Sequence, residues 1–345
     1  MSVEVPASWR SLALDPPRAG GAPPVSGRLR AEPADFIVDE QLGFAPAGEG
    51  PHVLLRVRKR DANTDWVARE LARRARCRPF DVGYAGLKDR HAVTTQWFTV
   101  PRGKGGVAEW LDVAGEGYAV LEAHAHHRKL PRGALAGNRF ELRVRELRGD
   151  RDALAARLAA IGAQGVPDYF GPQRFGRELS NLARVAAGDW RTERSFGLSA
   201  ARSLVFNAVL ARRVEEGSWA RLEAGDVANL DGKGSVFEVG APDAALEARV
   251  AALDVHPTGP LWGAGEPRVR GRIAALEQEV AAGFAAVCAG LVGERVDMAR
   301  RPLRVAVREL AHGFEGDVLV LRFGLTAGSF ATTVLRELVD QPSST

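Results

Sequence analysis

Cysteine is almost absent from this sequence, which has only Cys77 and Cys288 among its 345 residues. Two cysteines this far apart provide neither a disulfide framework nor the closely spaced ligand pairs of a zinc site, and we expect neither. Long apolar runs are missing as well, because no stretch approaches the roughly 20 apolar residues that a membrane-spanning helix needs. The N-terminus lacks the basic and then apolar order of a secretory signal. We therefore expect a cytoplasmic protein without a membrane partner.

Sequence signatures of cofactor binding and of hydrolysis are absent too. The glycine-rich stretches KGG (104–106) and GKGS (232–235) do not match a phosphate loop and lack the strand and helix context of a dinucleotide fingerprint. No GxSxG nucleophile motif occurs. The clustered histidines His124, His126 and His127 alternate between the two faces of a predicted strand, and we interpret them as part of a basic strand that faces phosphates or solvent. We expect no metal and no small-molecule cofactor.

Positive charge is concentrated in the first part of the chain. The formal net charge is +4, but residues 1–204 carry 32 Lys and Arg against 24 Asp and Glu, whereas residues 205–345 carry 15 against 19. The cations are densest in Arg56–Arg78 and Arg128–Arg148. Lysine is scarce, so nearly all of these cations are arginines, whose planar guanidinium groups suit phosphate. This pattern favours a polyanionic partner, most simply a nucleic acid.

The order of helical and strand-like segments predicts two domains in an α+β protein. Residues 1–26 are rich in Pro, Ala and Gly without periodicity, which predicts a poorly ordered or loosely docked arm. Strand-like segments with interspersed helices follow, such as the helix expected from Thr64 with that residue as its N-cap. Helical patterns dominate from about residue 150 to 291, and strands then return. We expect a largely antiparallel sheet that is completed from both ends of the sequence.

The polar segment GLKDRHAVTTQ, residues 86–96, contains one carboxylate, Asp89, between Lys88 and Arg90. By residue type alone it is most simply a salt-bridged turn. Acidic residues also repeat in AEPADFIVDE, residues 31–40, where they most simply mark polar edges around a buried Phe36. Taken one at a time, neither segment identifies a function.

Together with GVPDYFGPQRFG, residues 165–176, the segment GLKDRHAVTTQ resembles the TruD family of tRNA pseudouridine synthases. The other motifs of the family fall in the right order along the chain: AEPADFIVDE, KRDANTDWVARELARR, KLPRGALAGNRFELRVRE, LSAARSLVFNAVLARR and AGSFATTVLREL. The resemblance spans roughly residues 28–340, and several ordered motifs are far more specific than a KDR triplet. One departure is Asp168, where relatives commonly have Asn; it adds a negative charge to a loop expected to face RNA.

The resemblance implies a pseudouridine synthase catalytic domain, with a mixed, largely antiparallel sheet, at residues 1–164 and 305–345. It also implies an inserted α/β TRUD domain at residues 165–304. The expected reaction is isomerisation of uridine in tRNA, at position 13 of the D arm: the N1–C1′ bond breaks, the base rotates, and a C5–C1′ bond forms. We expect a monomer that binds tRNA. The alternative is a non-catalytic RNA-binding or RNA-folding protein on the same scaffold.

Asp89 lies where the family has its catalytic aspartate. A carboxylate is ionised at neutral pH and can attack C1′ of the ribose or C6 of the base, or can abstract a ribose proton; all three routes stay open. If the side chain of Lys88 or Arg90 comes close, it would keep this carboxylate charged and would meet phosphate.

The family's substrate-binding positions correspond to Phe36, Asn138 and Phe330. An enzyme that acts on a base in folded RNA must first flip the base out, and an aromatic ring recovers part of that cost by stacking on it. The two phenylalanines can supply such rings. The amide of Asn138 offers both a donor and an acceptor, as a uracil edge or a ribose hydroxyl requires.

Overall fold

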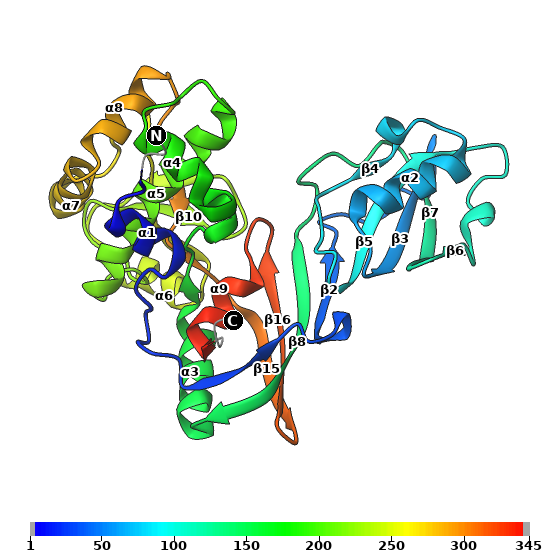
Figure 1. The fold of residues 1–345 in the computed structure, drawn as a ribbon, viewed down its shortest axis with the longest axis horizontal. Coiled ribbons are helices and arrows are strands. Elements are labelled where there is room, and N and C mark those ends of the chain that lie inside the picture. Colours follow the sequence, from blue (N-terminus) through cyan, green and yellow to red (C-terminus); the bar gives the residue numbers. More distant parts are fainter. Residues whose placement is uncertain (1–3, 341–345) are drawn as a thin grey trace. The chain divides into compact units, whose positions relative to one another are not determined.

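The computed structural model describes residues 4–340, and its packing divides the chain into two compact units. The sheet unit comprises Val25–Arg151, Arg308–Gly328 and the residues from Val339 onward. The helical unit comprises the residues up to Pro24, Asp152–Val307 and Ser329–Leu338. Each unit is thus assembled from segments that are far apart in the sequence (Figure 1). The assignment of residues 1–164 and 305–345 to a catalytic domain, and of 165–304 to an insert, stays a prediction.

The sheet unit is built around one 11-stranded sheet. Its main strand order is β15-β16-β8-β2-β5-β3-β7-β6, while β1 pairs with β8 and β17, and β4 pairs with β5. The strands are β1 (Val25–Leu29), β2 (Phe36–Gln41), β3 (His52–Arg60), β4 (Gly83–Tyr84), β5 (Val93–Pro101), β6 (Ala114–Gly115), β7 (Tyr118–His126), β8 (Gly137–Gly149), β15 (Arg308–Glu315), β16 (Val318–Thr326) and β17 (Val339–Asp340). Within the described residues, β2 with β5 and β1 with β17 are the parallel pairs. The predicted mixed, largely antiparallel sheet is therefore confirmed.

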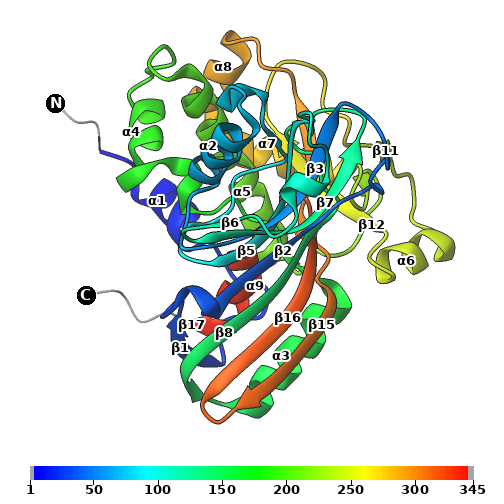
Figure 2. The ribbon, with the colours of Figure 1, turned by 90° about the vertical axis from the view of Figure 1, so that its right-hand side faces the viewer.

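Strand β16, from the C-terminal part of the sequence, lies beside β8, which is distant from it in the sequence (Figure 2), and β17 pairs with β1. Phe323 in β16 is paired with Phe140 in β8, and the two rings stack with their centroids 5.4 Å apart. On the other side of β8, the ring of Phe36 in β2 meets Phe140 edge to face at 6.2 Å. A row of aromatic rings thus joins three strands, and the prediction that both ends of the sequence complete the sheet is confirmed.

Helix α2 (Thr64–Ala75) packs on the sheet through one apolar stripe. Val67 and Leu71 are four residues apart, so they lie on one face of the helix. Both belong to the same buried cluster as Val57 of β3. The helix begins at Thr64, but its N-cap is Asn63 and no side chain caps it. The hydroxyl of Thr64, which we expected to cap the helix, instead forms hydrogen bonds with Gln96 and with the backbone of Lys88. Three short 3₁₀ helices complete the unit: η1 (Pro33–Asp35), η2 (Pro79–Asp81) and η3 (Ala108–Trp110).

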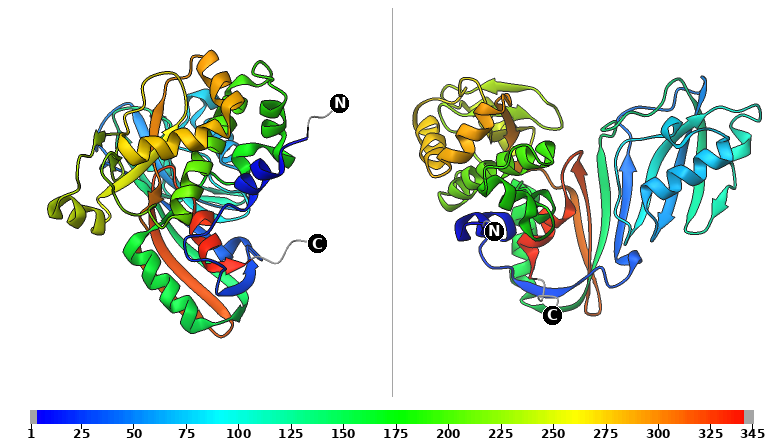
Figure 3. Two further views of the ribbon diagram at one scale, coloured as in Figure 1. Left: turned by 90° about the vertical axis from the view of Figure 1, so that its left-hand side faces the viewer. Right: turned by 45° about the horizontal axis from the view of Figure 1, so that its top comes forward.

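The helical unit is organised around the long helix α5 (Arg194–Glu215), much of which is buried. Figure 3 shows the helices of this unit from two further sides. The other helices of this unit are α1 (Ala7–Leu14), α3 (Arg151–Gln164), η4 (Pro172–Phe175), η5 (Arg177–Leu179), α4 (Ser180–Ala186), α6 (Ala244–Ala251), α7 (Gly271–Ala282), α8 (Ala285–Gly293) and α9 (Ala331–Leu338). A four-stranded sheet has the order β11 (Val236–Glu238), β10 (Val227–Leu230), β12 (Val255–Leu261) and β13 (Ala299–Pro302). β9 (Val166–Pro167) pairs with β14 (Arg304–Val305).

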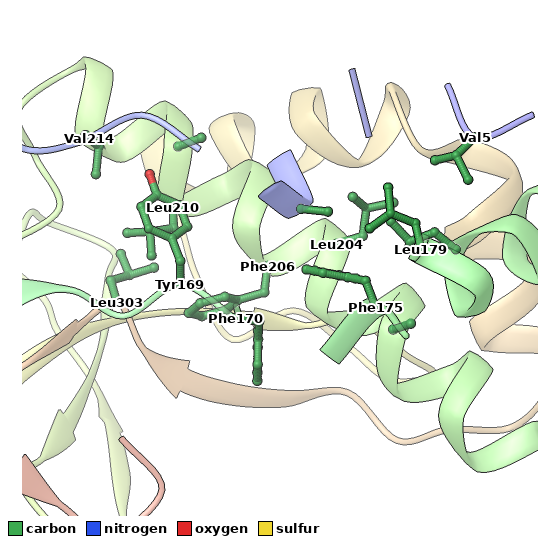
Figure 4. Packing of buried hydrophobic residues seen from close by; sticks show 14 of the residues in the cluster. Val5, Tyr169, Phe170, Phe175, Leu179, Leu204, Phe206, Leu210, Val214 and Leu303 are labelled. Carbon is green, nitrogen blue, oxygen red and sulfur yellow. The ribbon is translucent and has the colours of Figure 1, made fainter. Parts of the chain in front are cut away.

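The core of the helical unit brings the loop after β9 against α5 (Figure 4). The ring of Phe170 meets that of Phe206 edge to face, with centroids 5.3 Å apart. Asn207 fixes the same loop, because its Oδ1 accepts from the backbone N–H of Phe170 at 2.9 Å and its Nδ2 donates to the Phe170 carbonyl at 3.0 Å. Phe170 is therefore held by both its ring and its backbone.

Composition predicts a poorly ordered or loosely docked arm over residues 1–26, whereas the described residues 4–24 include a packed helix. They contain α1, whose residue Ala13 is 1% exposed. Asn207 Nδ2 donates to the carbonyl of Leu12 at 3.0 Å, and the ring of Trp9 stacks on that of Phe284 at 6.0 Å. A helix of eight residues is too short to show a clear apolar period, so the sequence pattern does not predict it.

The helical pattern expected up to residue 291 ends in two helices, α7 and α8, which meet at a bend of 96°. None of the single helices in residues 4–340 has the length and apolar character needed to cross a bilayer. The pair of α7 and α8 reaches that length only when it is counted across the bend.

Candidate active site

Asp89 lies in the loop between β4 and β5, and its side chain is 49% exposed. Its carboxylate accepts a hydrogen bond from Nη2 of Arg30 at 3.3 Å. Arg30 follows β1 in the left-handed region, with φ of 54°, and its guanidinium also lies 3.9 Å from the centroid of the Phe36 ring. One arginine thus links Asp89 to Phe36, two residues that the family resemblance assigns to the same uridine.

The two cations next to Asp89 in the sequence are paired with other acids. Lys88 Nζ lies 2.6 Å from Glu40 Oε2, and these side chains are 10% and 0% exposed. Arg90 Nε lies 3.9 Å from Asp61 Oδ1 in a solvent-exposed pair. The cation that contacts the Asp89 carboxylate therefore comes from a different segment of the chain, and not from its sequence neighbours as expected.

Lys59 tethers the backbone of the Asp89 loop. It is only 1% exposed, and its Nζ donates to the carbonyl oxygens of Asp89 and Ala62, each at 2.8 Å, and lies 3.4 Å from the Lys88 carbonyl. Burial lowers the pKa of Lys59 from 10.5 to about 8, although the charge of Asp89 opposes this change. An ammonium group has three N–H donors, and here they serve three carbonyls. The main chain at Asp89 is fixed as a result.

A second set of hydrogen bonds holds the residues before Asp89. Thr64 Oγ1 donates to Gln96 Oε1 at 2.8 Å and accepts from the backbone N–H of Lys88 at 3.0 Å. Gln96 Nε2 donates to the carbonyl of Gly86 at 3.1 Å. Thr64 and Gln96 are buried on α2 and β5. The loop therefore rests on two regular elements, which is how a carboxylate is held in one position.

The strand register places the candidate residues on one face of the sheet. Glu40 in β2 is paired with Asn138 in β8, and Lys59 in β3 is paired with Thr94 in β5. The register between β2 and β5 keeps these two pairs on the same side. Because side chains alternate along a strand, Phe36 shares that face with Glu40. The aromatic, acidic, basic and amide groups thus come from three strands, β2, β3 and β8, while β5 adds the hydroxyl of Thr94.

Phe36 and Asn138 differ in how they present their side chains. Phe36 is 3% exposed, since Arg30 covers its ring, so a base can stack on it only after Arg30 moves. Asn138 is partly buried, and its Oδ1 receives no hydrogen bond from the described residues. Buried amide oxygens normally have a donor. The Oδ1 of Asn138 therefore keeps the capacity to accept a hydrogen bond.

Phe330 belongs to the helical unit and is 41% exposed just before α9. It lines a pocket together with Phe170, Arg174 and Phe196. The structure therefore collects Asp89, Phe36 and Asn138 within the sheet unit and presents Phe330 on the surface of the helical unit.

Asp168, the departure from the family pattern, is buried and not directed to solvent. It is 4% exposed and forms an ion pair with Arg301, whose guanidinium also lies 4.5 Å from the centroid of the Phe170 ring. Burial raises the pKa of Asp168, and the charge of Arg301 opposes this change. The charge at residue 168 is matched inside the helical unit, so it does not repel an RNA phosphate at the surface of the loop.

The histidines of β7 do not form a metal centre. His124 Nε2 lies 3.2 Å from Glu122, whereas His126 is buried with its ring 5.4 Å from that of Phe44. Burial lowers the pKa of His126. Across residues 4–340, no group of three or more His, Cys, Asp or Glu side chains is arranged to hold a metal ion.

Arg30, Lys59 and Glu40 belong to this site, although sequence reasoning did not select Arg30 or Lys59 and treated Glu40 as a polar edge. Lys59 left a signal, because it continues the buried face of β3 that Val53, Leu55 and Val57 begin. A lysine at an apolar position of a strand is rare unless its charge is satisfied. Arg30 gave no such signal, since its contact with Asp89 depends on tertiary structure.

Comparisons with known proteins agree with this arrangement. The family model described as tRNA pseudouridine synthase D (TruD) matches residues 19–188 and 191–338. A curated tRNA pseudouridine synthase D from Methylococcus capsulatus is 49% identical over 334 residues, covering 94% of each chain. One from Nitrosococcus oceani is 46% identical, covering 93% of this chain and 92% of the relative. A solved structure from Methanosarcina mazei, described as a tRNA pseudouridine synthase D (TruD), shares the fold with a TM-score of 0.77, at 22% identity, over 97% of this chain and 98% of that one.

Proposed function

The chain belongs to the TruD family of tRNA pseudouridine synthases, and from this we propose that Asp89 is the carboxylate with which it isomerises uridine in tRNA. The activity, an isomerisation of uridine to pseudouridine, is that of its curated relatives. They support an enzyme and not the non-catalytic RNA-binding protein considered as the alternative. We propose position 13 of the D arm as the target.

The reaction exchanges one bond for another without net oxidation. The glycosidic N1–C1′ bond breaks, the base rotates, a C5–C1′ bond forms, the hydrogen at C5 leaves as a proton, and N1 gains a proton. Asp89 acts either as a nucleophile on C1′ or C6, or as a base that removes a ribose proton. Each route requires the carboxylate anion and a fixed position. Because the reaction is redox-neutral, we propose that no cofactor takes part.

The observation that carries the assignment is the fixed setting of Asp89. Its carboxylate contacts the Arg30 guanidinium, and its carbonyl accepts from the buried Lys59 ammonium. The backbone tether removes the freedom of movement that would weaken catalysis. Asp89 is therefore a solvent-accessible carboxylate that is held through its side chain by Arg30 and through its backbone by Lys59.

We assign the remaining candidates to the flipped uridine and its phosphates. The ring of Phe36, once Arg30 has moved, and the ring of Phe330 each offer a face on which a base can stack, a contact worth about 1–3 kcal/mol. The Asn138 Oδ1 accepts from the base or ribose. Lys88, paired with Glu40, supports the loop that carries Asp89. Arg90 is 65% exposed at its side chain and is free to contact a phosphate.

Basic surface near the Asp89 tether supports an RNA partner. A shallow hollow of about 360 Å³ is lined by Arg58, Arg60, Tyr118 and neighbouring residues. Guanidinium groups beside an aromatic ring are suited to a phosphate backbone with adjacent bases. Binding through phosphates weakens steeply with salt. We propose a monomer that meets tRNA in the cytoplasm, where its substrate is found.

Replacing Asp89 by Asn tests the proposal. Asp89→Asn keeps the size of the side chain but removes the anion, so we expect turnover to fall to background while tRNA affinity stays within a few fold. Tritium release from 5-tritiated uridine in tRNA measures turnover, and filter binding measures affinity. Asp112→Asn, at an exposed loop position, is the matched control and should be fully active. Substantial isomerisation by Asp89→Asn would contradict the catalytic role.

A further inference from the structure

Leu87 is a large apolar residue exposed in the same loop that carries Asp89. Leu87 is 67% exposed, and the side chain of Asp89 is 49% exposed. The side chain of Lys88, between them, is only 10% exposed because its ammonium pairs with the buried Glu40. The loop thus turns Lys88 inward and leaves Leu87 and Asp89 on its solvent side. An apolar side chain therefore accompanies the proposed catalytic carboxylate wherever that carboxylate meets RNA.

The backbone on both sides of Leu87 is anchored to regular elements of the sheet unit. The carbonyl of Gly86 accepts from Gln96 Nε2 at 3.1 Å, and the backbone N–H of Lys88 donates to Thr64 Oγ1 at 3.0 Å. A loop fixed at these points cannot fold back to bury its leucine. Leu87 is instead held outward before RNA arrives, so little conformational entropy is lost when it makes a contact.

The chemistry of leucine limits what this side chain can do with RNA. A single exposed leucine is ordinary on a protein surface, so its position decides the interpretation. Its side chain has no donor, acceptor or charge for a phosphate or for the edge of a base, but it can pack on the face of one. Proteins that kink DNA insert leucine and other apolar side chains between neighbouring bases. An enzyme that takes a base out of a stack leaves such a gap close to its catalytic group.

We propose that Leu87 is a wedge that enters the base stack of the tRNA at the place vacated by the target uridine. The inference deepens the proposed function, because it takes the uridine to leave a stack in order to reach Asp89. The ligand of Leu87 is the pair of bases that flank the uridine. By packing on their uncovered faces, Leu87 offsets part of the cost of unstacking and keeps the uridine from returning.

The variant Leu87→Ala, assayed with two substrates, tests the wedge. One substrate is an intact, chemically synthesised tRNA. The other has abasic nucleotides on both sides of the target uridine, which then has no stack to leave. With intact tRNA we expect Leu87→Ala to lower the single-turnover rate about 10- to 100-fold, since the cost of unstacking is no longer offset. With the abasic substrate, Leu87→Ala should react as fast as the wild type. Leu87→Met should react as fast as the wild type on both, because it keeps an apolar side chain of similar volume.

A fluorescence measurement keeps the test independent of the chemical step. The fluorescent base 2-aminopurine, which brightens when it loses its stacking partner, replaces one base next to the target uridine. The protein carries Asp89→Asn, so that the uridine is not converted. Saturation of the tRNA with this protein should raise the fluorescence, and adding Leu87→Ala should remove most of the rise.

Controls separate the wedge from a role in folding or in holding the uridine. Leu111→Ala removes another exposed leucine, which is 55% exposed and follows η3, and should change neither the rates nor the fluorescence. The melting temperature of Leu87→Ala should equal that of the wild type, since most of the side chain is in solvent.

Three results would overturn the wedge: an unchanged rate of Leu87→Ala on intact tRNA, an equal loss on both substrates, or an unchanged fluorescence rise. The second of these would make Leu87 a contact of the uridine itself or a part of the fold, and the melting temperature tells these two apart. If the wild type isomerises neither substrate, the proposed function fails, and the fluorescence still decides whether Leu87 enters the stack.

Discussion

Replacing Lys59 by Met separates positioning of the catalytic loop from stability of the fold. Lys59→Met keeps the length of the side chain and removes the ammonium that donates to the carbonyls of Asp89 and Ala62. The Asp89 main chain then loses its only described contact with a buried cation, while the Arg30 contact to the carboxylate remains. We expect kcat to fall and the fold to persist.

The magnitudes follow from the geometry. Leaving a buried carbonyl without a donor costs about 1–3 kcal/mol, so the two bonds of 2.8 Å correspond to roughly 2–6 kcal/mol. A second effect stabilises the variant. The pKa of Lys59 is lowered from 10.5 to about 8, so burying the protonated amine costs about 3 kcal/mol, and Lys59→Met removes this cost. The net change in the free energy of unfolding should lie within about 3 kcal/mol of zero. A displacement of about 1 Å at a catalytic group can cost roughly 100-fold in rate, and we expect a loss of that order in kcat.

The assay combines single-turnover tritium release with urea denaturation on the same preparations. Lys104→Met is the control, because Lys104 is exposed in the loop after β5 and should change neither quantity. Retention of kcat within about threefold by Lys59→Met would refute the positioning role. A collapse of both stability and activity would show that Lys59 serves the fold alone.

Two further predictions follow from buried charges. Between pH 8 and 10.5 the unfolded chain still holds the proton that folded Lys59 has released. The free energy of unfolding of the wild type should therefore rise with pH in this range, by up to about 3 kcal/mol more than that of Lys59→Met. Urea denaturation measures both proteins, and parallel pH curves would contradict this prediction. The guanidinium of Arg213 binds both carboxylate oxygens of Asp226, and the two side chains are 1% and 0% exposed. Arg213→Ala leaves this carboxylate buried without its partner and should lower the free energy of unfolding by about 3–5 kcal/mol. The double variant Arg213→Met with Asp226→Leu should recover much of that loss, and a loss below about 1 kcal/mol for Arg213→Ala would be inconsistent with the pair as described.

The fold was predictable where the pattern of side chains is local. Alternating residues along β2 and β3 and the apolar stripe of α2 indicate their own secondary structure, and the mixture of strands with a helical middle predicts α+β. The pairing of β16 with β8 was expected only in outline, because register depends on partners that are distant in sequence. The helix α1 was missed since it is short, and the bend between α7 and α8 was missed because a continuous apolar pattern does not reveal a break.

The sequence predicted several residues of the candidate site, but it did not predict the contacts between them. The family resemblance singled out Asp89, Phe36 and Asn138, and their roles stay predictions that the variants above test. The charge partner of Asp89 was expected among its sequence neighbours, Lys88 and Arg90. Adjacent residues on an irregular loop need not point the same way, and a buried acid such as Glu40 attracts Lys88 more strongly than an exposed one.

The pairing of the first strand with the last has a consequence for synthesis of the protein. Val25 in β1 lies beside Val339 in β17, and β8 has β16 as its neighbour on one side. While the chain is still emerging from the ribosome, the edge of β8 that β16 will cover has no partner, and such an edge readily captures other chains. Closure of the sheet waits for the synthesis of β16 and β17, so a nascent chain that stalls before β16 would leave this edge exposed and be prone to aggregate.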